Sequence, residues 1–159
     1  MPEEGMVWLD RKEILSFEEI YRLAQICVER FDVDSIRLTG GEPTVRAHLP
    51  VLVEKLAKLR VPETANSPLA GKNIDLAMTT NGATLRLIAE ELKSAGLSRI
   101  NVSLDTLQQE KFLKITRRDH LANVIDGIDA AVQVGFAPVK VNAVIQRGVN
   151  DDEIVALAS

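Results

Sequence analysis

The sequence contains a single cysteine, no long apolar run and no excess of basic residues. One cysteine, Cys27, excludes an internal disulfide and is typical of a reducing compartment. No apolar run approaches the length that spans a bilayer, and the start of the chain is acidic and lacks the apolar stretch of a signal peptide. With 19 basic and 23 acidic side chains the net charge is -4, so nothing indicates a nucleic-acid or membrane partner. We therefore expect a cytoplasmic protein.

The 159 residues suffice for one domain with a substantial core, and helical and extended segments alternate along them. Ser16 and Glu19 form a capping-box pattern, and apolar residues follow it at helical spacing from Ile20 to Phe31. Cys27 lies on that stripe, so we interpret it as a small core residue.

Boundary signals divide the rest of the chain into further helices, strands and one polar loop. Strands are predicted over residues 35–39, 73–80, 99–105 and 139–145. Helices are predicted over 47–59, from 85 to a stop at Gly96, near 108–113, and from 121 to a stop at Gly135. A polar loop covers 61–72, and the acidic run 150–153 is expected to start a last helix. His48 and His120 have no partner at metal-ligand spacing, so neither receives a role.

This alternation predicts right-handed βαβ units and a parallel α/β sheet, either doubly wound or barrel-shaped. Polar residues recur on one face near the carboxyl ends of all four strands: Arg37 with Thr39, Thr79 with Asn81, Asn101 with Ser103 and Asp105, and Lys140 with Asn142. A filled barrel core could not bury so many polar groups without partners. We therefore predict an incomplete TIM-type barrel of parallel βα units, whose wet lumen holds a polar ligand.

Arg37 and Lys140 would face an anion in that lumen, most simply a phosphate. Structural roles stay open for single residues, since Asp105 could cap the helix after it and Lys140 could lie at an exposed edge. Recurrence at the same end of four strands favours a binding site.

The segment from Arg37 to Pro43 joins a strand end to two glycines, a carboxylate and a proline. Gly40 and Gly41 leave the main chain unshielded, so a ligand can approach it closely, and Glu42 offers an acceptor to an ammonium group. These features suit a small zwitterion. A βα turn in which the glycines only allow tight geometry explains Gly40-Gly41-Glu42-Pro43 equally well.

Four segments together resemble one family of radical S-adenosylmethionine (SAM) enzymes, the GTP 3′,8-cyclases, or molybdenum cofactor biosynthesis proteins A. The matching stretches are Arg37 to Pro43, Thr79-Thr80-Asn81-Gly82, Arg99 to Asp105, and Val139-Lys140-Val141-Asn142, with Gly148 to Asp151 also similar. Gly-Gly-Glu-Pro alone indicates only a radical SAM protein, whereas the combination in order is more specific. The resemblance covers essentially the whole chain, as the central part of a barrel truncated at both ends.

The resemblance implies a ligand for each predicted site residue. Gly40, Gly41, Glu42 and Ser103 would bind SAM, and Arg37, Thr79 and Lys140 would bind GTP. In the family a [4Fe–4S] cluster passes an electron to SAM, giving a 5′-deoxyadenosyl radical. That radical takes a hydrogen from the ribose of GTP, whose carbon then closes onto C8 of guanine to give 3′,8-cyclo-7,8-dihydro-GTP. The implied partners also include a second copy of the chain and the downstream cyclic pyranopterin-forming enzyme.

The sequence departs from the family in its cysteines. The family's Cys-x3-Cys-x2-Cys precedes the segment that resembles Met1 to Gly5, and a second cysteine set lies beyond the region matched here. A [4Fe–4S] cluster needs several thiolates, so we expect that this chain alone binds no cluster, catalyses nothing, and exposes two sheet edges that favour aggregation. Alternatives are a naturally short, non-catalytic nucleotide- or SAM-binding or partner protein, and a radical SAM enzyme with another substrate.

Overall fold

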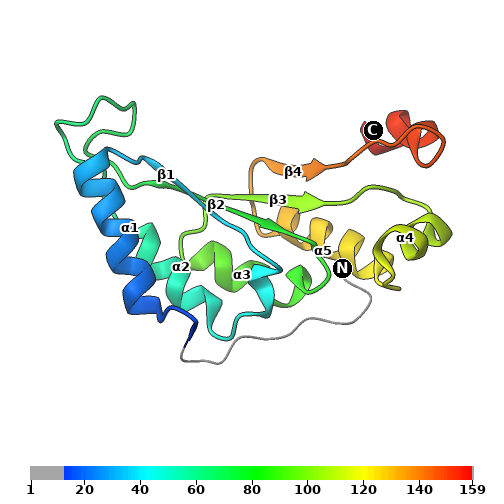
Figure 1. Ribbon diagram of the computed structural model, residues 1–159, viewed down its shortest axis with the longest axis horizontal. Helices are drawn as coiled ribbons and strands as arrows, with labels where there is room; N and C mark the ends of the chain where they lie inside the picture. Colours follow the sequence, from blue (N-terminus) through cyan, green and yellow to red (C-terminus); the bar gives the residue numbers. More distant parts are fainter. Residues whose placement is uncertain (1–12, 159) are drawn as a thin grey trace.

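Four strands form one parallel sheet in the order β1-β2-β3-β4 in the computed structural model, which describes residues 13–158 (Figure 1). The strands are β1 (Ser35–Leu38), β2 (Asp75–Thr80), β3 (Arg99–Ser103) and β4 (Val139–Asn142). Each is joined to the next through at least one helix, as parallel pairing requires. The predicted α/β class and open partial barrel are thereby confirmed.

Helices pack on one face of this sheet. Figure 1 shows α1 (Phe17–Phe31), α2 (Leu49–Ala57), α3 (Leu85–Ser94) and α5 (Leu121–Gln133) beneath the strands. The remaining helical segments, α4 (Gln109–Thr116), the 3₁₀ turns η2 (Pro43–Val45) and η3 (Asp151–Glu153), and α6 (Ile154–Ala158), follow the carboxyl ends of strands. Within the described residues, no helix covers the upper face.

The side chains of the strands alternate between these two faces. On the helix side, β2 and β3 place four fully buried residues: Leu76, Met78, Ile100 and Val102. The same core includes Leu56 of α2, Leu85 and Leu92 of α3, and Val124 of α5. At roughly 1.5–3 kcal/mol for each large apolar side chain, this burial fixes the register, because a slip by one residue would turn the apolar set outward.

Several element boundaries differ from those predicted. The strand expected to reach residue 145 ends at Asn142, because the Val144 N–H donates to Asp105 Oδ1 at 2.8 Å instead of continuing the ladder. Helix α2 begins at Leu49 rather than near residue 47, since His48 adopts a left-handed conformation with φ of 60°. The acidic run gives a 3₁₀ turn before the short α6.

The prediction that Cys27 is a core residue is wrong. The α1 helix starts with the predicted capping box between Ser16 and Glu19, but only part of its apolar stripe is covered. Val28 is fully buried, whereas Cys27, Leu23 and Phe31 are exposed. These three residues recur every four positions, so they form one ridge of the helix that no described residue covers.

The loop of residues 61–72 is closed at its base. The Val61 N–H donates to Lys72 O at 2.9 Å, and the Gly71 N–H donates back to Val61 O at 3.0 Å. Ser67 Oγ donates to Asp34 Oδ2 at 2.6 Å, which joins the loop to the residue before β1. Residues 61–72 are therefore a folded loop that precedes β2 and is attached to the residue before β1.

Within residues 13–158, every helix is too short or too polar to cross a lipid bilayer. The stretch Met1 to Gly5, to which the family resemblance also extends, lies outside the described residues.

Gly127 of α5 tests the contact between the helix layer and the turn after β2. An added Cβ would lie 2.5 Å from Gly82 O and 3.1 Å from Leu85 Cβ. We expect Gly127→Ala to lower the free energy of unfolding by about 1–3 kcal/mol through overpacking, although alanine favours a helix. A chemical denaturation curve measures this loss. Gly41→Ala is the control, because nothing lies within 4 Å of its Cβ position, and an equally stable Gly127→Ala would contradict the packing.

Candidate functional site

The uncovered face of the sheet carries two rows of side chains across the strands. In one row, Thr79 of β2 is in register with Asn101 of β3, and Asn101 with Lys140 of β4. In the other, Arg37 of β1 is in register with Ala77, and Ala77 with Arg99. Residues in register on neighbouring parallel strands point to the same face. The predicted GTP residues Arg37, Thr79 and Lys140 therefore share one face.

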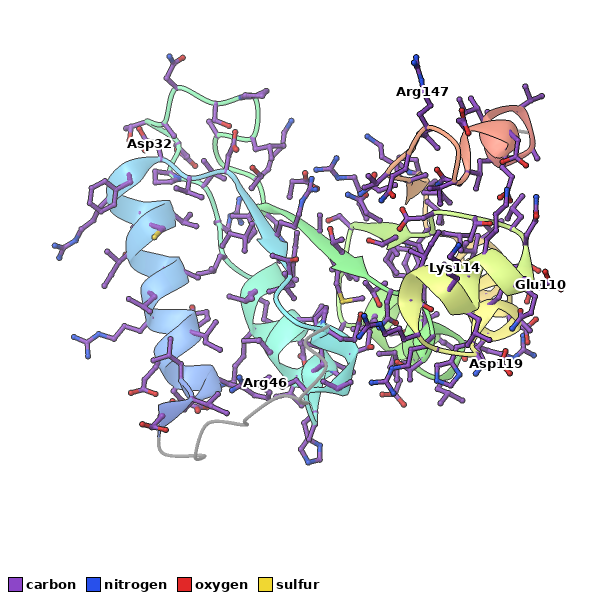
Figure 2. The ribbon with its side chains drawn as sticks, turned by 45° about the vertical axis from the view of Figure 1, so that its right-hand side comes forward. Asp32, Arg46, Glu110, Lys114, Asp119 and Arg147 are labelled. Carbon is purple, nitrogen blue, oxygen red and sulfur yellow. The ribbon has the colours of Figure 1, made fainter. Side chains whose placement is uncertain are left out.

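Two cations on this face have no acidic partner among the residues that the structure describes. Arg37 and Lys140 are exposed, and neither forms an ion pair with any residue in the 13–158 range. Other charged side chains lie around the edge of the molecule, such as Lys114 and Glu110 on α4 and Arg147 in the loop after β4 (Figure 2). An exposed guanidinium and an exposed ammonium on one polar sheet face suit an anion with several oxygens.

The turn after β1 presents bare main chain. Gly40 has φ of 137°, a conformation open to glycine and strained for other residues. Gly41 has no such constraint, and no heavy atom lies within 4 Å of the position its Cβ would take. Nothing within the described chain requires glycine at position 41. The open space beside it is what the close approach of a ligand to the backbone needs.

Glu42 joins the ends of β1 and β2. Its Oε1 accepts hydrogen bonds from the hydroxyls of Thr44 at 2.6 Å and Thr80 at 2.7 Å, and its Oε2 accepts from the Asn81 N–H at 2.7 Å. Thr84 Oγ1 donates to Thr44 Oγ1 at 2.7 Å and extends the network to the start of α3. The carboxylate thus positions the Gly40-Gly41 turn and keeps one oxygen with a single donor, which leaves it capacity for an ammonium group.

Thr80 is a site residue that sequence reasoning missed. It points to the helix side of β2, where its hydroxyl is almost fully buried, accepts from the Gly82 N–H at 3.1 Å and donates to Glu42. The signal was present in the sequence, because Thr80 is the one polar residue at the apolar positions of that strand. A lone buried hydroxyl needs a partner.

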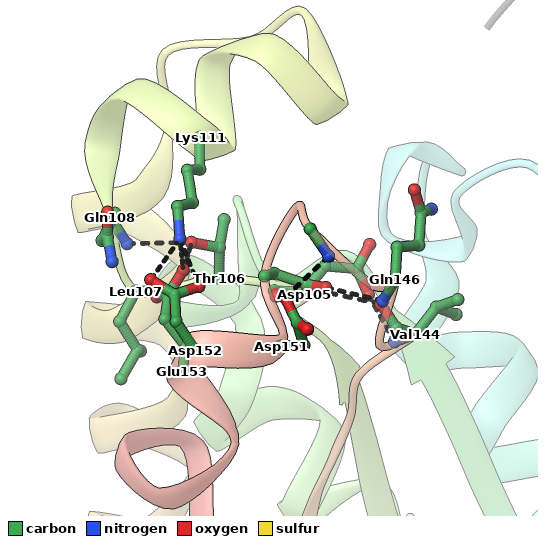
Figure 3. Close-up of polar contacts among 12 residues, drawn as sticks. Asp105, Thr106, Leu107, Gln108, Lys111, Val144, Gln146, Asp151, Asp152 and Glu153 are labelled. Atoms are coloured by element: carbon green, nitrogen blue, oxygen red, sulfur yellow. Dashed lines mark hydrogen bonds and ion pairs between the residues drawn. The ribbon is translucent and has the colours of Figure 1, made fainter.

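A second polar network joins the loops after β3 and β4 (Figure 3). Asn150, which is buried, donates through Nδ2 to Asp105 O at 2.6 Å and to Val144 O at 3.0 Å. Asp105 accepts from the Val144 N–H rather than capping the next helix, so the capping alternative is wrong. The Thr106 hydroxyl accepts from the Gln108 N–H at 3.1 Å, which closes a turn just before α4. These bonds fix the chain that follows Ser103 of β3 and Asn142 of β4.

Glu153 is the buried charge of this network. It accepts from Thr106 Oγ1 at 2.7 Å and from the Leu107 N–H at 2.8 Å, and Lys111 Nζ lies 3.1 Å away (Figure 3). Burial raises the pKa of Glu153, but these hydrogen bonds outweigh it and the pKa lies below its usual value. Lys111 also bonds Asp152 at 2.6 Å, which raises the pKa of the Lys111 ammonium.

The four predicted SAM residues lie at the carboxyl ends of two strands. Gly40, Gly41 and Glu42 follow β1, and Ser103, which is exposed, ends β3, with the end of β2 between them. Ligand sites of parallel α/β folds lie at this end. Gly41, with its open space, and the fixed carboxylate of Glu42 fit the zwitterionic end of SAM.

The residues present do not fit an iron–sulfur cluster. Cys27 is the only cysteine of the sequence, and it lies on α1, which leads into the amino end of β1. The Gly40-Gly41 turn lies beyond the opposite end of that strand. No cluster of three or more His, Cys, Asp or Glu side chains in the described part of the chain could hold a metal ion.

A surface hollow lies elsewhere, away from the strand ends. It has a volume of about 720 Å³ between the ends of α2 and α3 and is lined by Val51, Glu54, Ala95 and Ser98, among others. It is a shallow surface depression with none of the predicted site residues, so volume alone does not mark the site here.

Comparison with known proteins assigns the chain to a protein family. The family model of the radical SAM superfamily matches residues 6–159. The chain belongs to the radical SAM superfamily.

Relatives within it share a single name. The chain is 48% identical over 157 residues to the GTP 3′,8-cyclase of Rhodopirellula baltica, covering 99% of this chain and 41% of that protein. It is 46% identical over 154 residues to GTP 3′,8-cyclase 2 of Pseudomonas aeruginosa, covering 97% and 43%. With the GTP 3′,8-cyclase of Thermodesulfovibrio yellowstonii the identity is 43% over 159 residues, covering 99% and 46%. The chain thus spans less than half the length of these relatives, and the family resemblance is confirmed.

The Lys111 network predicts a specific pH dependence of stability. Because the pKa of Glu153 is lowered from 4.5 and that of Asp152 from 3.8, both carboxylates stabilise the fold above these ordinary values. That stability is lost as the pH falls through the lowered values. The raised pKa of Lys111 has the opposite sign: its contribution is complete below 10.5 and is lost as the pH rises through the folded-state value.

We expect Lys111→Met to reduce the difference in melting temperature between pH 7 and pH 3, compared with the original chain, because the variant lacks the cation that lowers both carboxyl pKa values. Lys114→Met, also on α4 but exposed, is the matched control (Figure 2). Parallel pH profiles for the original chain and Lys111→Met would contradict the role of this network.

Proposed function

We propose that this chain forms the GTP- and SAM-binding core of a GTP 3′,8-cyclase of molybdenum cofactor biosynthesis. The observation that carries the proposal is the uncovered polar face of the sheet, on which Arg37 and Lys140 are exposed and have no ion-pair partner among the described residues. The curated relatives, at 43–48% identity, bear the name of that activity.

In this proposal the two cations bind the triphosphate of GTP. Each offers charge-assisted hydrogen bonds to phosphate oxygens, and the guanidinium of Arg37 can bind two of them at once. Thr79, in register with Asn101 and two residues beyond Ala77 in β2, donates a hydroxyl to the same ligand. Ser103 and the turn of Gly40, Gly41 and Glu42 hold the methionine end of SAM at the carboxyl ends of β3 and β1.

SAM, when bound, supplies the group that abstracts a hydrogen atom from the ribose of GTP. The residues of this chain orient the two ligands toward each other and hold them against rigid strands, so that the reacting atoms stay close. The thiolates of a [4Fe–4S] cluster are supplied from outside these 159 residues, because the sequence has one cysteine. We infer that the chain by itself binds ligands and is not catalytic.

Three further elements of the proposal rest on the expectations drawn from the sequence and its family resemblance. They are a homodimer, hand-over of the product to a cyclic pyranopterin-forming enzyme, and a cytoplasmic location. Each stays a prediction.

Removing charges from the sheet face tests whether GTP binds there. It also distinguishes this proposal from the alternative of a radical SAM enzyme with another substrate. We expect Arg37→Ala and Lys140→Ala each to weaken GTP binding by about 1.5–3 kcal/mol, roughly ten- to a hundredfold in Kd, measured by titration calorimetry. Lys114→Ala removes one charge from the exposed surface of α4 and should leave the Kd unchanged. Equal Kd values for all four chains would refute GTP as the ligand of this face.

A further inference from the structure

Arg99 shares the row of Arg37 but lies two strands away. The registers Arg37↔Ala77 and Ala77↔Arg99 place the two arginines on the same face, on either side of the smallest side chain of β2. Strands lie about 4.8 Å apart, so the two Cα atoms are separated by roughly 10 Å. Two long guanidinium side chains at that separation can reach one group placed between them.

A cavity lies at this position. Its volume is about 110 Å³, and it is lined by Ser35, Ile36, Arg37, Asp75, Ala77 and Arg99. The methyl group of Ala77 leaves open the space that a larger side chain would fill. A single phosphoryl group fits in this volume, whereas a nucleoside does not.

Asp75 holds the Arg99 side chain in place. Arg99 donates from Nε to Asp75 Oδ1 at 3.1 Å and from Nη2 to Asp75 Oδ2, a bidentate ion pair between β3 and β2. Guanidinium has five N–H donors, so three remain for another acceptor. With Arg37 and Arg99 positive and Asp75 negative, the charged side chains that line the cavity carry a net positive charge.

We propose that Arg37 and Arg99 form a phosphate subsite over Ala77, with Arg99 as a binding residue and Asp75 as its positioning residue. This inference rests on the proposed function: the subsite takes the terminal phosphate of GTP. The row of Thr79, Asn101 and Lys140 lies two strand residues, about 7 Å, nearer the carboxyl ends. A polyphosphate bound to Lys140 therefore extends along the sheet into the cavity between the arginines.

The competing explanation is that Arg99 only ties β3 to β2. The two explanations differ for Asp75, since removal of either partner breaks the ion pair but only Arg99 would contact phosphate. Arg99→Gln should lower GTP affinity at least about tenfold, the cost of a charge-assisted phosphate contact, and leave GMP affinity within about twofold. Asp75→Asn should leave GTP affinity equal or higher, because the amide oxygen can still accept from Arg99 and hold it in place while the negative charge beside the phosphate is removed.

Titration calorimetry of the 159-residue chain with GTP, ATP, GMP and inorganic tripolyphosphate measures these differences, and a thermal melt of each variant reports the fold. Arg86→Gln on α3, in the helix layer, is the matched charge control. Ala77→Val fills the cavity without removing charge and should also weaken GTP and tripolyphosphate but not GMP. If Arg99→Gln has a lower melting temperature than the original chain, Ala77→Val still tests the subsite.

Equal losses for GTP and GMP in Arg99→Gln, or no loss in both Arg99→Gln and Ala77→Val, would overturn the subsite. The proposed function would survive that result if Arg37→Ala and Lys140→Ala still weakened GTP binding. If Arg99→Gln weakened tripolyphosphate but the chain did not prefer GTP over ATP, the subsite would stand and the GTP assignment would fail.

Discussion

Alternate side chains of each strand point to opposite faces of the sheet, and within residues 13–158 only one of these faces is packed with helices. Leu76, Met78, Ile100 and Val102 are fully buried on the helix side. This burial fixes the register, and the register then places Arg37, Thr79 and Lys140 on the other face without any further interaction. The polar face is therefore a consequence of how the core is packed, and Arg37 and Lys140 on it are exposed to solvent.

Two carboxylates hold the loops that frame this face. Glu42 ties the glycine turn after β1 to the end of β2, and Glu153 ties the turn after β4 to the segment after β3. Both accept main-chain and hydroxyl donors from a neighbouring βα loop. These hydrogen bonds hold the loops at the carboxyl ends of neighbouring strands in fixed positions relative to each other.

The sequence predicted the strands, the main helices and the shared polar face, because periodicity and alternation are local signals. It failed where an interaction between distant segments decides the outcome. The β4 strand ends early because Asp105, far away in the chain, takes the Val144 N–H. Cys27 lies on an apolar stripe of which only part is covered. Arg99 lies two residues before Asn101 in β3, so the same alternation could have placed it on the polar face.

A GTP titration followed by backbone amide chemical shifts tests whether the uncovered sheet face is the nucleotide site. We expect the largest shift changes at Arg37, Thr79, Asn101 and Lys140, with small changes in the helix layer. Largest changes at the 720 Å³ depression between α2 and α3, with none along the four strands, would contradict it.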